Sequence, residues 1–422
     1  MDLQNKLVII GLGSNEEPLK HLRQALLKLR QQSNLKIKKV SRIYESDAQT
    51  PIGANDSWNK KYLNAAVLIE VFEFEPFLLL KQLKRIEKEI GRTESESWAP
   101  RKIDLDILFA DQYKLETETL NIPHKLFFER AFAYLPAQEV NSNLGQMIFK
   151  NSYDTKLSSY VWPELAAIMN MTPDSFSDGG QILDKAFFLK QARIHLLDGA
   201  DYLDVGAEST RPGASIIESV VEIERLKIAF DAIKILKSEG HQFKVSLDSR
   251  NYETIQKITD QFQVDLINDV SGLGDLRILK LIKEKNMKAV CMHSLTVPAD
   301  KKITLPIHIN PAHEILNWWN QKNELFNQFH INQEHIFFDP GFGFGKTIEQ
   351  NQYLIKNLDE MNQIKSSFFL GYSRKSFLNA NNENWDQKTA VITKNINLSF
   401  GQILRLHNIA INKKALKEKN EL

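Results

Sequence analysis

The chain has 422 residues, of which 42% are hydrophobic and 25% are charged, and its formal net charge is +1. This length predicts two domains, because domains usually hold ~100–200 residues and barrels ~250. The near-zero net charge argues against nucleic acid or an anionic membrane as a partner, so any anion binding must come from local arrangements.

Three features predict a cytoplasmic protein. Cys291 is the single cysteine, which rules out an intrachain disulfide and fits a reducing compartment. The first ten residues, MDLQNKLVII, are too short and too acidic for a signal peptide. No apolar run approaches the ~20 residues that cross a bilayer, so we expect no membrane partner.

The first part of the chain is predicted to form, in order, strand, helix, strand, strand, helix and strand. Residues 7–10 are a short apolar strand, and leucines at helical spacing follow from Leu19 to Leu29. Residues 62–71 alternate as a strand, Pro76 opens a second helix that Gly91 ends, and residues 102–109 form a further strand. This order predicts an α+β domain over residues 1–145, a ferredoxin-like antiparallel sheet with helices.

The pattern changes after a polar stretch, residues 146–162, which we expect to be a linker. Over residues 163–422, short apolar runs recur with helical patterns between most of them. Such alternation is typical of a parallel sheet covered on both faces, and eight units predict a (β/α)8 TIM barrel. The strands are expected at residues 166–169, 202–205, 243–247, 265–267, 289–292, 336–338, 368–370 and 403–406.

Two acids, Asp104 and Asp106, share one face of the strand at residues 102–109. The apolar residues that alternate with them, and that we expect on the core face, are Ile103, Leu105, Ile107 and Phe109. Two carboxylates on one face can hold one or two Mg²⁺ ions that bridge a triphosphate, and phosphoryl transfer needs this charge neutralisation. Taken alone, the pair fits a solvated strand face equally well.

Basic and aromatic residues elsewhere in this part favour a phosphate site. The basic residues are Arg92, Arg101, His124 and Arg130, and arginine suits bidentate phosphate contacts. Residues 93–100, between Arg92 and Arg101, contain two glutamates and no lysine or arginine. Tyr62 and Asn64 share a face of their strand, where a ring and an amide can stack on a flat heterocycle and read its edge.

Four motifs stand out in this part: G-L-G-S-N at 11–15, T-P-I-G at 50–53, Y-L-N-A-A-V at 62–67 and W-A-P-R-K-I-D-L-D at 98–106. Over about residues 5–140 the chain therefore resembles the 6-hydroxymethyl-7,8-dihydropterin pyrophosphokinase family. The resemblance implies pyrophosphate transfer from ATP to the pterin, with Mg²⁺ on Asp104 and Asp106. It further implies catalytic arginines Arg92 and Arg101; ATP contacts from Glu87, Trp98, Arg101, His124 and Arg130; and pterin contacts from Thr50, Pro51, Tyr62, Asn64 and Phe132.

Polar residues follow most of the predicted barrel strands at their carboxyl ends, where the active sites of barrels lie. They include Asn170, Asp204, Asp248, Asn268, Asp339, Lys375, Arg405 and His407. Buried carboxylates with an amide can match the donor-rich edge of a pterin. Arg405 and His407, with Mg²⁺ on Asn170, can hold a pyrophosphate.

The barrel part carries N-M-T-P-D-S-F-S-D-G-G at 170–180, E-S-T-R-P-G at 208–213, D-P-G-F-G-F-G-K at 339–346 and G-Y-S-R-K-S at 371–376. Over about residues 163–415 it resembles dihydropteroate synthase, a family whose barrels commonly form homodimers. The resemblance implies catalytic roles for Lys375 and Arg211. It implies pterin contacts from Asp248, Asn268, Met292, Asp339 and Lys375; p-aminobenzoate contacts from Thr210, Arg211, Pro212, Phe344 and Ser376; and pyrophosphate contacts from Asn170, Arg405 and His407.

Together the two resemblances imply a bifunctional enzyme of folate biosynthesis. Its second reaction would condense the pterin pyrophosphate with p-aminobenzoate, giving 7,8-dihydropteroate and pyrophosphate, and sulfonamides would inhibit that step. One alternative is a pterin-binding module that donates methyltetrahydrofolate to a partner; the intact loops at 172–176 and 209–213 argue against it. Another is a degenerate kinase domain with a structural role, against which the intact acids and arginines argue.

Overall fold

The computed structural model describes residues 5–48, 58, 60–93, 100–146, 157–160, 163–172, 185–210, 214–300, 302–378, 384–396 and 402–420. The chain forms two compact units. One comprises Met1–Trp162, and the other consists mainly of Pro163–Asn397 and Gln402–Glu418.

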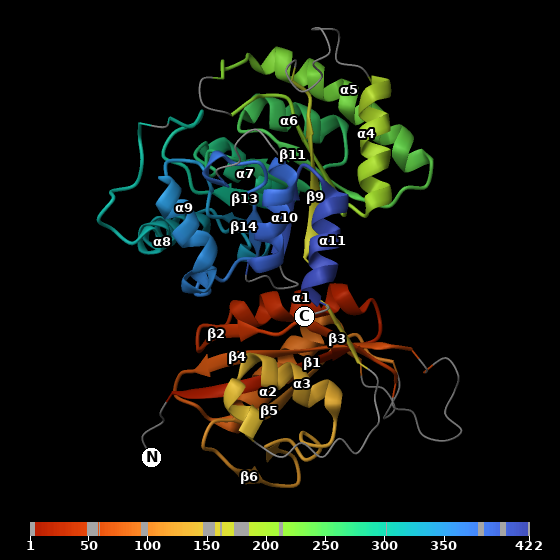
Figure 1. Ribbon diagram of the computed structural model, residues 1–422, viewed down its shortest axis with the longest axis vertical. Coiled ribbons are helices and arrows are strands. Elements are labelled where there is room, and N and C mark those ends of the chain that lie inside the picture. Colours follow the sequence, from red (N-terminus) through yellow and green to blue (C-terminus); the bar gives the residue numbers. More distant parts are fainter. Residues whose placement is uncertain are drawn as a thin grey trace. The chain divides into compact units, whose positions relative to one another are not determined.

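An antiparallel sheet forms the N-terminal unit, with its strands in the order β5-β1-β4-β3-β8 and with β2 also paired to β4 (Figure 1). The strands are β1 (Lys6–Ser14), β2 (Leu35–Val40), β3 (Ile43–Ser46), β4 (Tyr62–Val71), β5 (Asp104–Ala110) and β8 (Ser158–Tyr160), with a separate ribbon of β6 (Leu115–Glu116) and β7 (Asn121–Ile122). The helices are α1 (Pro18–Arg30), α2 (Pro76–Ile90) and α3 (Ala131–Val140), and a 3-10 turn covers Ser142–Gln146.

Helices cover both faces of this sheet. The apolar sides of α1 and α2 form one core with the sheet, and α3 packs in a second core on the opposite face. Helix α2 begins where the sequence predicts, because the carboxylate of Glu75 accepts hydrogen bonds from the Phe77 and Leu78 N–H groups. It ends at Gly91, whose φ of 95° suits glycine. The antiparallel α+β fold predicted for this part is confirmed.

The alternation of side chains on β5 changes within the strand. Opposite β1, Ile9 pairs with Phe109 and Ile10 pairs with Ile107, so Leu108 is an extra residue in the ladder. A bulge of this kind turns the following side chains to the other face. Phe109 therefore packs in the core beneath α3 and not beside Ile107, so the expectation that it shares a face with Ile107 was wrong.

The stretch expected to be a linker contributes a strand to the N-terminal sheet. Ser158–Tyr160 forms β8, which pairs antiparallel with β3. The pairing joins Ile43 to Tyr160 and Glu45 to Ser158. Main-chain hydrogen bonds make this strand, so its polar side chains give little sign of it in the sequence.

Eight parallel strands close into a barrel in the C-terminal unit, and each of the predicted apolar runs overlaps one of them, to within a residue at its start for β11 and β12. The strands are β9 (Glu164–Asn170), β10 (Tyr202–Gly206), β11 (Lys244–Asp248), β12 (Leu266–Asp269), β13 (Ala289–Met292), β14 (Ile336–Asp339), β15 (Phe368–Leu370) and β16 (Gln402–Leu406). The helices between and after them are α4 (Lys185–Asp198), α5 (Ser219–Ser238), α6 (Tyr252–Gln261), α7 (Leu276–Lys285), α8 (Pro311–Gln328), α9 (Ile348–Lys356), α10 (Trp385–Asn395) and α11 (Ile409–Asn420). Figure 1 shows these helices outside the strands.

A layer of apolar side chains fills the barrel below its carboxyl end. Its members come from seven strands: Ala166, Tyr202, Leu266, Val290, Phe337, Phe369 and Ile403. Side chains two residues apart on a strand point to the same side, so the next layer toward the carboxyl end must also face inward. That layer contains Asp204, Asn268, Met292, Asp339 and Arg405.

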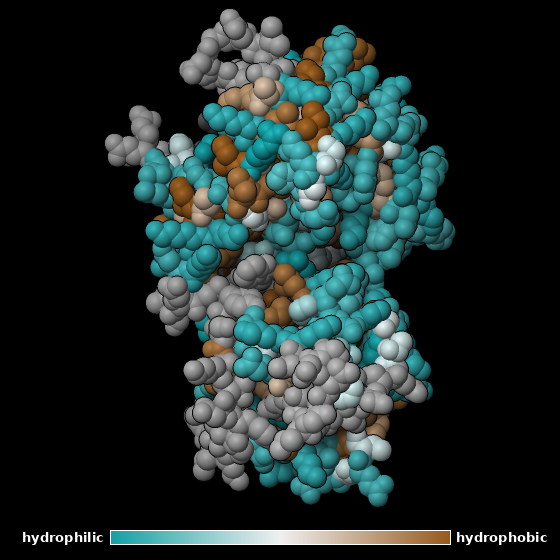
Figure 2. Space-filling model, turned by 90° about the vertical axis from the view of Figure 1, so that its right-hand side faces the viewer, coloured by the Kyte–Doolittle hydropathy of each residue, from teal (hydrophilic) through white to brown (hydrophobic). Residues whose placement is uncertain are grey.

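The outer surface carries apolar side chains singly and in small groups. Figure 2 shows one face as mostly hydrophilic with apolar patches. Exposed apolar residues on α4 and α5 include Leu197 and Val220. Among the described residues, no helix has the length and apolar character needed to cross a membrane.

Candidate active sites

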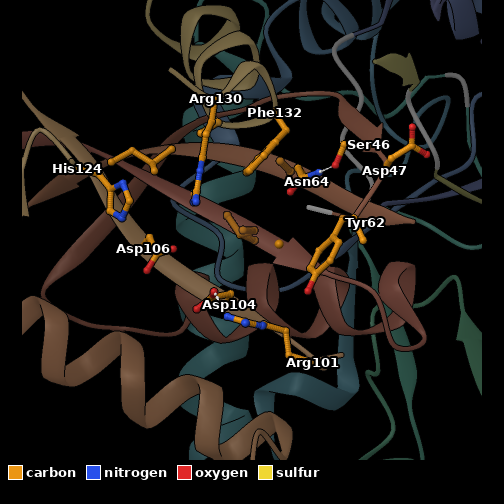
Figure 3. Close-up of a pocket in the computed structure, with 17 residues that line it drawn as sticks. Ser46, Asp47, Tyr62, Asn64, Arg101, Asp104, Asp106, His124, Arg130 and Phe132 are labelled. Atoms are coloured by element: carbon orange, nitrogen blue, oxygen red, sulfur yellow. Dashed lines mark hydrogen bonds and ion pairs between the residues drawn. The ribbon is translucent and has the colours of Figure 1, made fainter. Parts of the chain in front are cut away.

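A cavity of about 150 Å³ opens on the N-terminal sheet between β4, β5 and the start of α3. Its described lining includes Ser46, Asp47, Tyr62, Asn64, Arg101, Asp104, Asp106, His124, Arg130 and Phe132. Figure 3 shows the rings of Tyr62 and Phe132 on different sides of the space, with Asn64 between them. His124 and Arg130 lie toward the Asp106 side. The structure thus brings eight of the predicted residues together around this cavity: Tyr62, Asn64, Arg101, Asp104, Asp106, His124, Arg130 and Phe132. Arg92 and Glu87 are not among its described lining residues, and Arg92 pairs with both Asp104 and Glu87.

Arginines hold the first of the two acids. Arg92 donates to Asp104 Oδ1 at 2.5 Å, and Arg101 donates to Asp104 Oδ2 at 2.8 Å. The same Arg92 lies 2.7 Å from Glu87 Oε2. Burial raises the pKa of Asp104, but the charges of Lys84, Arg92 and Arg101 outweigh burial and lower it.

The second acid has a different environment. Burial and the neighbouring charge of Asp104 raise the pKa of Asp106. The nearest ammonium is that of Lys84, 3.8 Å from Asp106 Oδ1 and 3.6 Å from Asp104 Oδ1. Two adjacent carboxylates, of which Asp106 has its pKa raised by burial and by the charge of Asp104, form a site that a divalent cation would stabilise. In the described part of the chain, no group of three or more His, Cys, Asp or Glu side chains is arranged for a metal, so protein ligands for a cation here would come from this pair.

Side chains around the cavity are themselves held in place. The Asn64 amide donates to Ser46 Oγ at 3.0 Å, and the Arg130 guanidinium lies 5.7 Å from the centre of the Phe132 ring. Glu87 is buried on α2 and accepts from the Leu105 N–H at 2.7 Å, which ties the helix to β5. Glu87 therefore lies next to Asp104 and Asp106 on β5. Thr50, Pro51 and Trp98 lie outside the described residues.

A second cavity, of about 390 Å³, lies at the carboxyl end of the barrel. Eight of the predicted residues line it: Asn170, Thr210, Asp248, Phe344, Lys375, Ser376, Arg405 and His407. They come from β9, β11, β16 and the segments after β10, β14, β15 and β16. Asn268, Met292 and Asp339 are buried, and Arg211 and Pro212 lie outside the described residues.

Arg405, which lines this cavity, joins two carboxylates. It lies 2.5 Å from Asp204 Oδ2 through its Nε and also pairs with Asp248. The amide of Asn268 lies 3.3 Å from both oxygens of Asp204. Burial raises the pKa of Asp248 above its ordinary value, against the opposing charge of Arg405. Gly206 of β10 pairs with Asp248 of β11, and a Cβ at position 206 would lie about 3.1 Å from Asp248 Cβ. Glycine therefore allows the two strands to lie this close.

The loop after β14 forms another wall. Asp339 Oδ1 accepts from the Gly341 N–H at 2.7 Å, and burial raises the pKa of Asp339 to about 6. Lys375 Nζ lies 4.4 Å from the centre of the Phe344 ring. Met292 packs in the same apolar cluster as Phe344.

Buried Lys346 holds this loop from behind. Its Nζ donates to the carbonyls of Gly341 and Phe344, each at 2.9 Å, and lies 2.9 Å from His293 Nδ1. Burial lowers the pKa of Lys346 to about 7. The lysine therefore connects the loop after β14 to the end of β13.

His407 is oriented by hydrogen bonding. Its Nδ1 lies 3.0 Å from Ser373 Oγ, and its main-chain N–H donates to the same oxygen. The next residue, Asn408, donates to Asp386 of α10 at 3.1 Å. These contacts join the loops after β15 and β16 on one rim.

Two residues near the sites were absent from the predicted contacts. Asp204 was noted in the sequence only as a strand-end polar residue, yet it holds Arg405 and Asn268. Lys84 precedes Glu87 by one helical turn and hydrogen-bonds to it. Their spacing supplies a signal for both: Asp204 is two residues after inward-facing Tyr202, and Lys84 shares a helix face with Glu87.

Two families match the chain. Residues 166–402 match the family described as pterin binding enzymes. Residues 9–142 match the family described as 7,8-dihydro-6-hydroxymethylpterin-pyrophosphokinases.

The chain is 29% identical to the folate synthesis bifunctional protein of Chlamydia trachomatis, with coverage of 97% of this chain and 96% of the relative. Its fold resembles dihydropteroate synthase from Anaplasma phagocytophilum with bound 6-hydroxymethylpterin-monophosphate: 27% identity, TM-score 0.55, 62% of this chain and 99% of that chain. A Plasmodium falciparum HPPK-DHPS triple mutant with pteroate shares the fold over 99% of this chain and 95% of that one, at 20% identity and a TM-score of 0.54.

Proposed function

The chain belongs to the pterin binding enzyme family, and on that premise we propose how its residues carry out two successive reactions. It is a bifunctional enzyme of folate synthesis, with a pyrophosphokinase and a dihydropteroate synthase. The first reaction transfers pyrophosphate from ATP to 6-hydroxymethyl-7,8-dihydropterin. The second condenses the product with p-aminobenzoate and releases pyrophosphate.

The first reaction is proposed to occur at the cavity of the N-terminal unit. Tyr62 and Phe132 would stack on the pterin, and Asn64 would read its edge together with the segment that contains Thr50 and Pro51. What supports this assignment is the cavity itself, which is lined by two rings, an amide and two acids (Figure 3).

Charged residues would bind the phosphates. We assign Asp104 and Asp106 as ligands of Mg²⁺, which would neutralise phosphate charge when bound. Arg92 and Arg101 would contact the transferred group. We assign the remaining ATP contacts to Glu87, Trp98, His124 and Arg130. The support is the pairing of both arginines with Asp104, which places three charged groups of the site within hydrogen-bond distance.

The second reaction is proposed to occur at the carboxyl end of the barrel. Asp248, Asn268, Met292, Asp339 and Lys375 would hold the pterin, and Asn170, Arg405 and His407 would hold the pyrophosphate. An additional Mg²⁺ could bind at Asn170, whose amide oxygen is a ligand that hard cations accept. The observation that carries this proposal is the single cavity lined by Asn170, Asp248, Lys375, Arg405 and His407.

The chemistry of this second site would rest on electrostatics. Pyrophosphate would leave first, because its charge is held by Arg405 and His407 while the pterin ring delocalises the positive charge that remains. The neutral amine of p-aminobenzoate would then attack. Thr210, Arg211, Pro212, Phe344 and Ser376 would form its pocket and help to exclude water.

Three further assignments are proposals of the same kind. We place the protein in the cytoplasm, because its one cysteine, Cys291, is buried and free, as is usual in reducing compartments. We expect a homodimer through the barrel. We also expect each unit to fold around its own core, because separate apolar clusters lie in the sheet and in the barrel.

A coupled assay tests the proposed division of work. The full chain would receive ATP, Mg²⁺, hydroxymethyl-dihydropterin and p-aminobenzoate, with one component left out at a time. Omission of ATP should stop dihydropteroate formation, and supplied pterin pyrophosphate should restore it. Sulfonamides should inhibit only the second step. If supplied pterin pyrophosphate does not bypass ATP, the two-site assignment is wrong.

A further inference from the structure

We propose that Lys84 is a further catalytic residue of the pyrophosphokinase site and contacts the α-phosphate of ATP. This inference rests on the proposed function of the N-terminal cavity. The two acids differ in their cationic neighbours. Arg92 is shared between Asp104 and Glu87, and Arg101 pairs with Asp104. Lys84 is the lysine that lies near Asp106.

The position of Lys84 separates it from the pterin side of the site. It is not among the described residues that line the cavity in Figure 3. It reaches the acids from α2, and its Nζ donates to the Leu105 carbonyl at 3.2 Å on β5, the strand at the end of the sheet order. The pterin cavity and Lys84 therefore approach the carboxylate pair from different sides.

This arrangement indicates where the pterin and the phosphates of ATP would lie relative to the two acids. In pyrophosphoryl transfer, the hydroxymethyl oxygen bonds to the β-phosphorus and loses its proton to solvent. The bond from the β-phosphorus to the oxygen that bridges to the α-phosphorus breaks, and AMP leaves with the electron pair. If the pterin occupies the cavity and the transferred group lies at the acids, the α-phosphate lies on the far side of them, where Lys84 is.

Lys84 is held beside the acids by its hydrogen bond to Glu87 Oε1 at 2.8 Å, and part of its side chain remains open to a ligand. Its side chain is 43% exposed and stands 3.6–3.8 Å from the two acids, farther than the arginines stand from Asp104. Cations bound to the acids would offset the attraction of Asp104 and Asp106 for its ammonium, and a bound phosphate chain would then offer Lys84 a negative partner in addition to Glu87. A lysine there would stabilise the charge that develops on AMP as it leaves. No lysine or arginine occurs in residues 93–100, so the segment before Arg101 supplies no alternative cation.

Variants of the full chain test the role. Lys84→Met should lower kcat of the first reaction on the order of tenfold, because a charge-assisted phosphate contact is lost in the transition state. It should also raise the inhibition constant of AMP severalfold. Lys84→Arg should restore both values in large part. Lys88→Met, on the exposed side of the same helix, should change neither. The rate of the second reaction, assayed with supplied pterin pyrophosphate, should be the same in all variants. An unchanged rate would show that the chain is folded.

A measurement on the unmodified chain needs no variant. Bound AMP should protect Lys84, but not Lys88, from acetylation by a lysine reagent read out by mass spectrometry. The proposal fails if Lys84→Met matches Lys88→Met in kcat and AMP inhibition, or if Lys84 is acetylated equally with and without AMP. It also fails if Lys84→Met only lowers the Mg²⁺ requirement, since Lys84 would then be a counter-ion of the acids. Failure of the unmodified chain to form pterin pyrophosphate would instead overturn the proposed function.

Discussion

Arg405 and Asp204 form a buried ion pair inside the barrel, with Arg405 Nε 2.5 Å from Asp204 Oδ2. Asp204 is fully buried, and its two oxygens also face the amide of Asn268. Arg405 in addition contacts Asp248, so one guanidinium links a proposed pterin contact to a proposed pyrophosphate contact. Asp204 thereby holds Arg405 beside Asp248.

We expect Asp204→Asn to impair the second reaction through Arg405. The asparagine keeps the shape but removes the charge that holds the guanidinium, so kcat/KM with supplied pterin pyrophosphate should fall roughly tenfold or more. Breaking a buried ion pair costs about 3–5 kcal/mol, and urea denaturation should show a loss of that order. Asp231→Asn, at an exposed position of α5, is the matched control. Unchanged kcat/KM in Asp204→Asn would show that Arg405 needs no such partner.

Asp106→Ala should bring ATP-dependent pterin pyrophosphorylation below detection, because one of two carboxylates proposed to hold Mg²⁺ is lost. The barrel reaction on supplied pterin pyrophosphate should continue at its normal rate. Asp111→Ala changes an exposed acid just beyond the same strand and should affect neither reaction. Equal loss of both reactions in Asp106→Ala would contradict the assignment of two independent sites.

Pterin binding to the barrel should strengthen as the pH rises through about 6. Burial raises the pKa of Asp339 to about 6, and the ionised carboxylate is the form that would accept hydrogen bonds from the pterin edge. Acidification protonates Asp339 and removes an acceptor, so affinity should fall by up to about tenfold per pH unit below 6. Burial also raises the pKa of Asp248, which adds to the slope.

Calorimetric titration of pterin pyrophosphate between pH 5 and 8 measures this dependence. The Asp339→Asn variant should bind more weakly at pH 8 and show a smaller slope, because one titrating acceptor is missing. Titration of the ligand itself is common to both proteins and cancels in the comparison. An identical slope in the two proteins would assign the dependence to another group.

Lys346→Met should destabilise the barrel and loosen the loop after β14. The buried ammonium satisfies the carbonyls of Gly341 and Phe344, and its loss leaves them without this donor. An unsatisfied buried group costs about 1–3 kcal/mol, so the free energy of unfolding should fall by about 2 kcal/mol or more. Displacement of Phe344 should raise the KM for p-aminobenzoate. Lys356→Met, at an exposed position of α9, is the control and should change neither the free energy of unfolding nor the KM.

Much of the fold could be predicted from local patterns. The barrel strands are continuous apolar runs, because both faces of each strand are covered, and such runs are visible in the sequence. Helix α2 has an explicit beginning and end in Pro76 and Gly91. The bulge at Leu108 and the strand at Ser158–Tyr160 were not predictable in this way. Both depend on which main-chain groups a neighbouring strand presents.

The residue types of both sites were also visible in the sequence. Asp104 and Asp106 were visible in a motif. Asp248 and Arg405 were visible at strand ends, because parallel strands bring their carboxyl ends together by geometry alone. The partners of these residues were not visible. Arg405 and Asp204 are 201 residues apart in the chain, and Lys84 reaches Asp106 from a separate helix.

The sequence by itself thus determined the two folds and the chemistry that the side chains can perform, because apolar periodicity and residue type act over short stretches. Only the tertiary structure decided how the charges are shared: that Asp204 holds Arg405, that Lys346 holds the Phe344 loop, and that Lys84 stands beside the two acids. Electrostatic pairing depends on distance through space and on burial, and neither quantity is encoded at a single position of the chain.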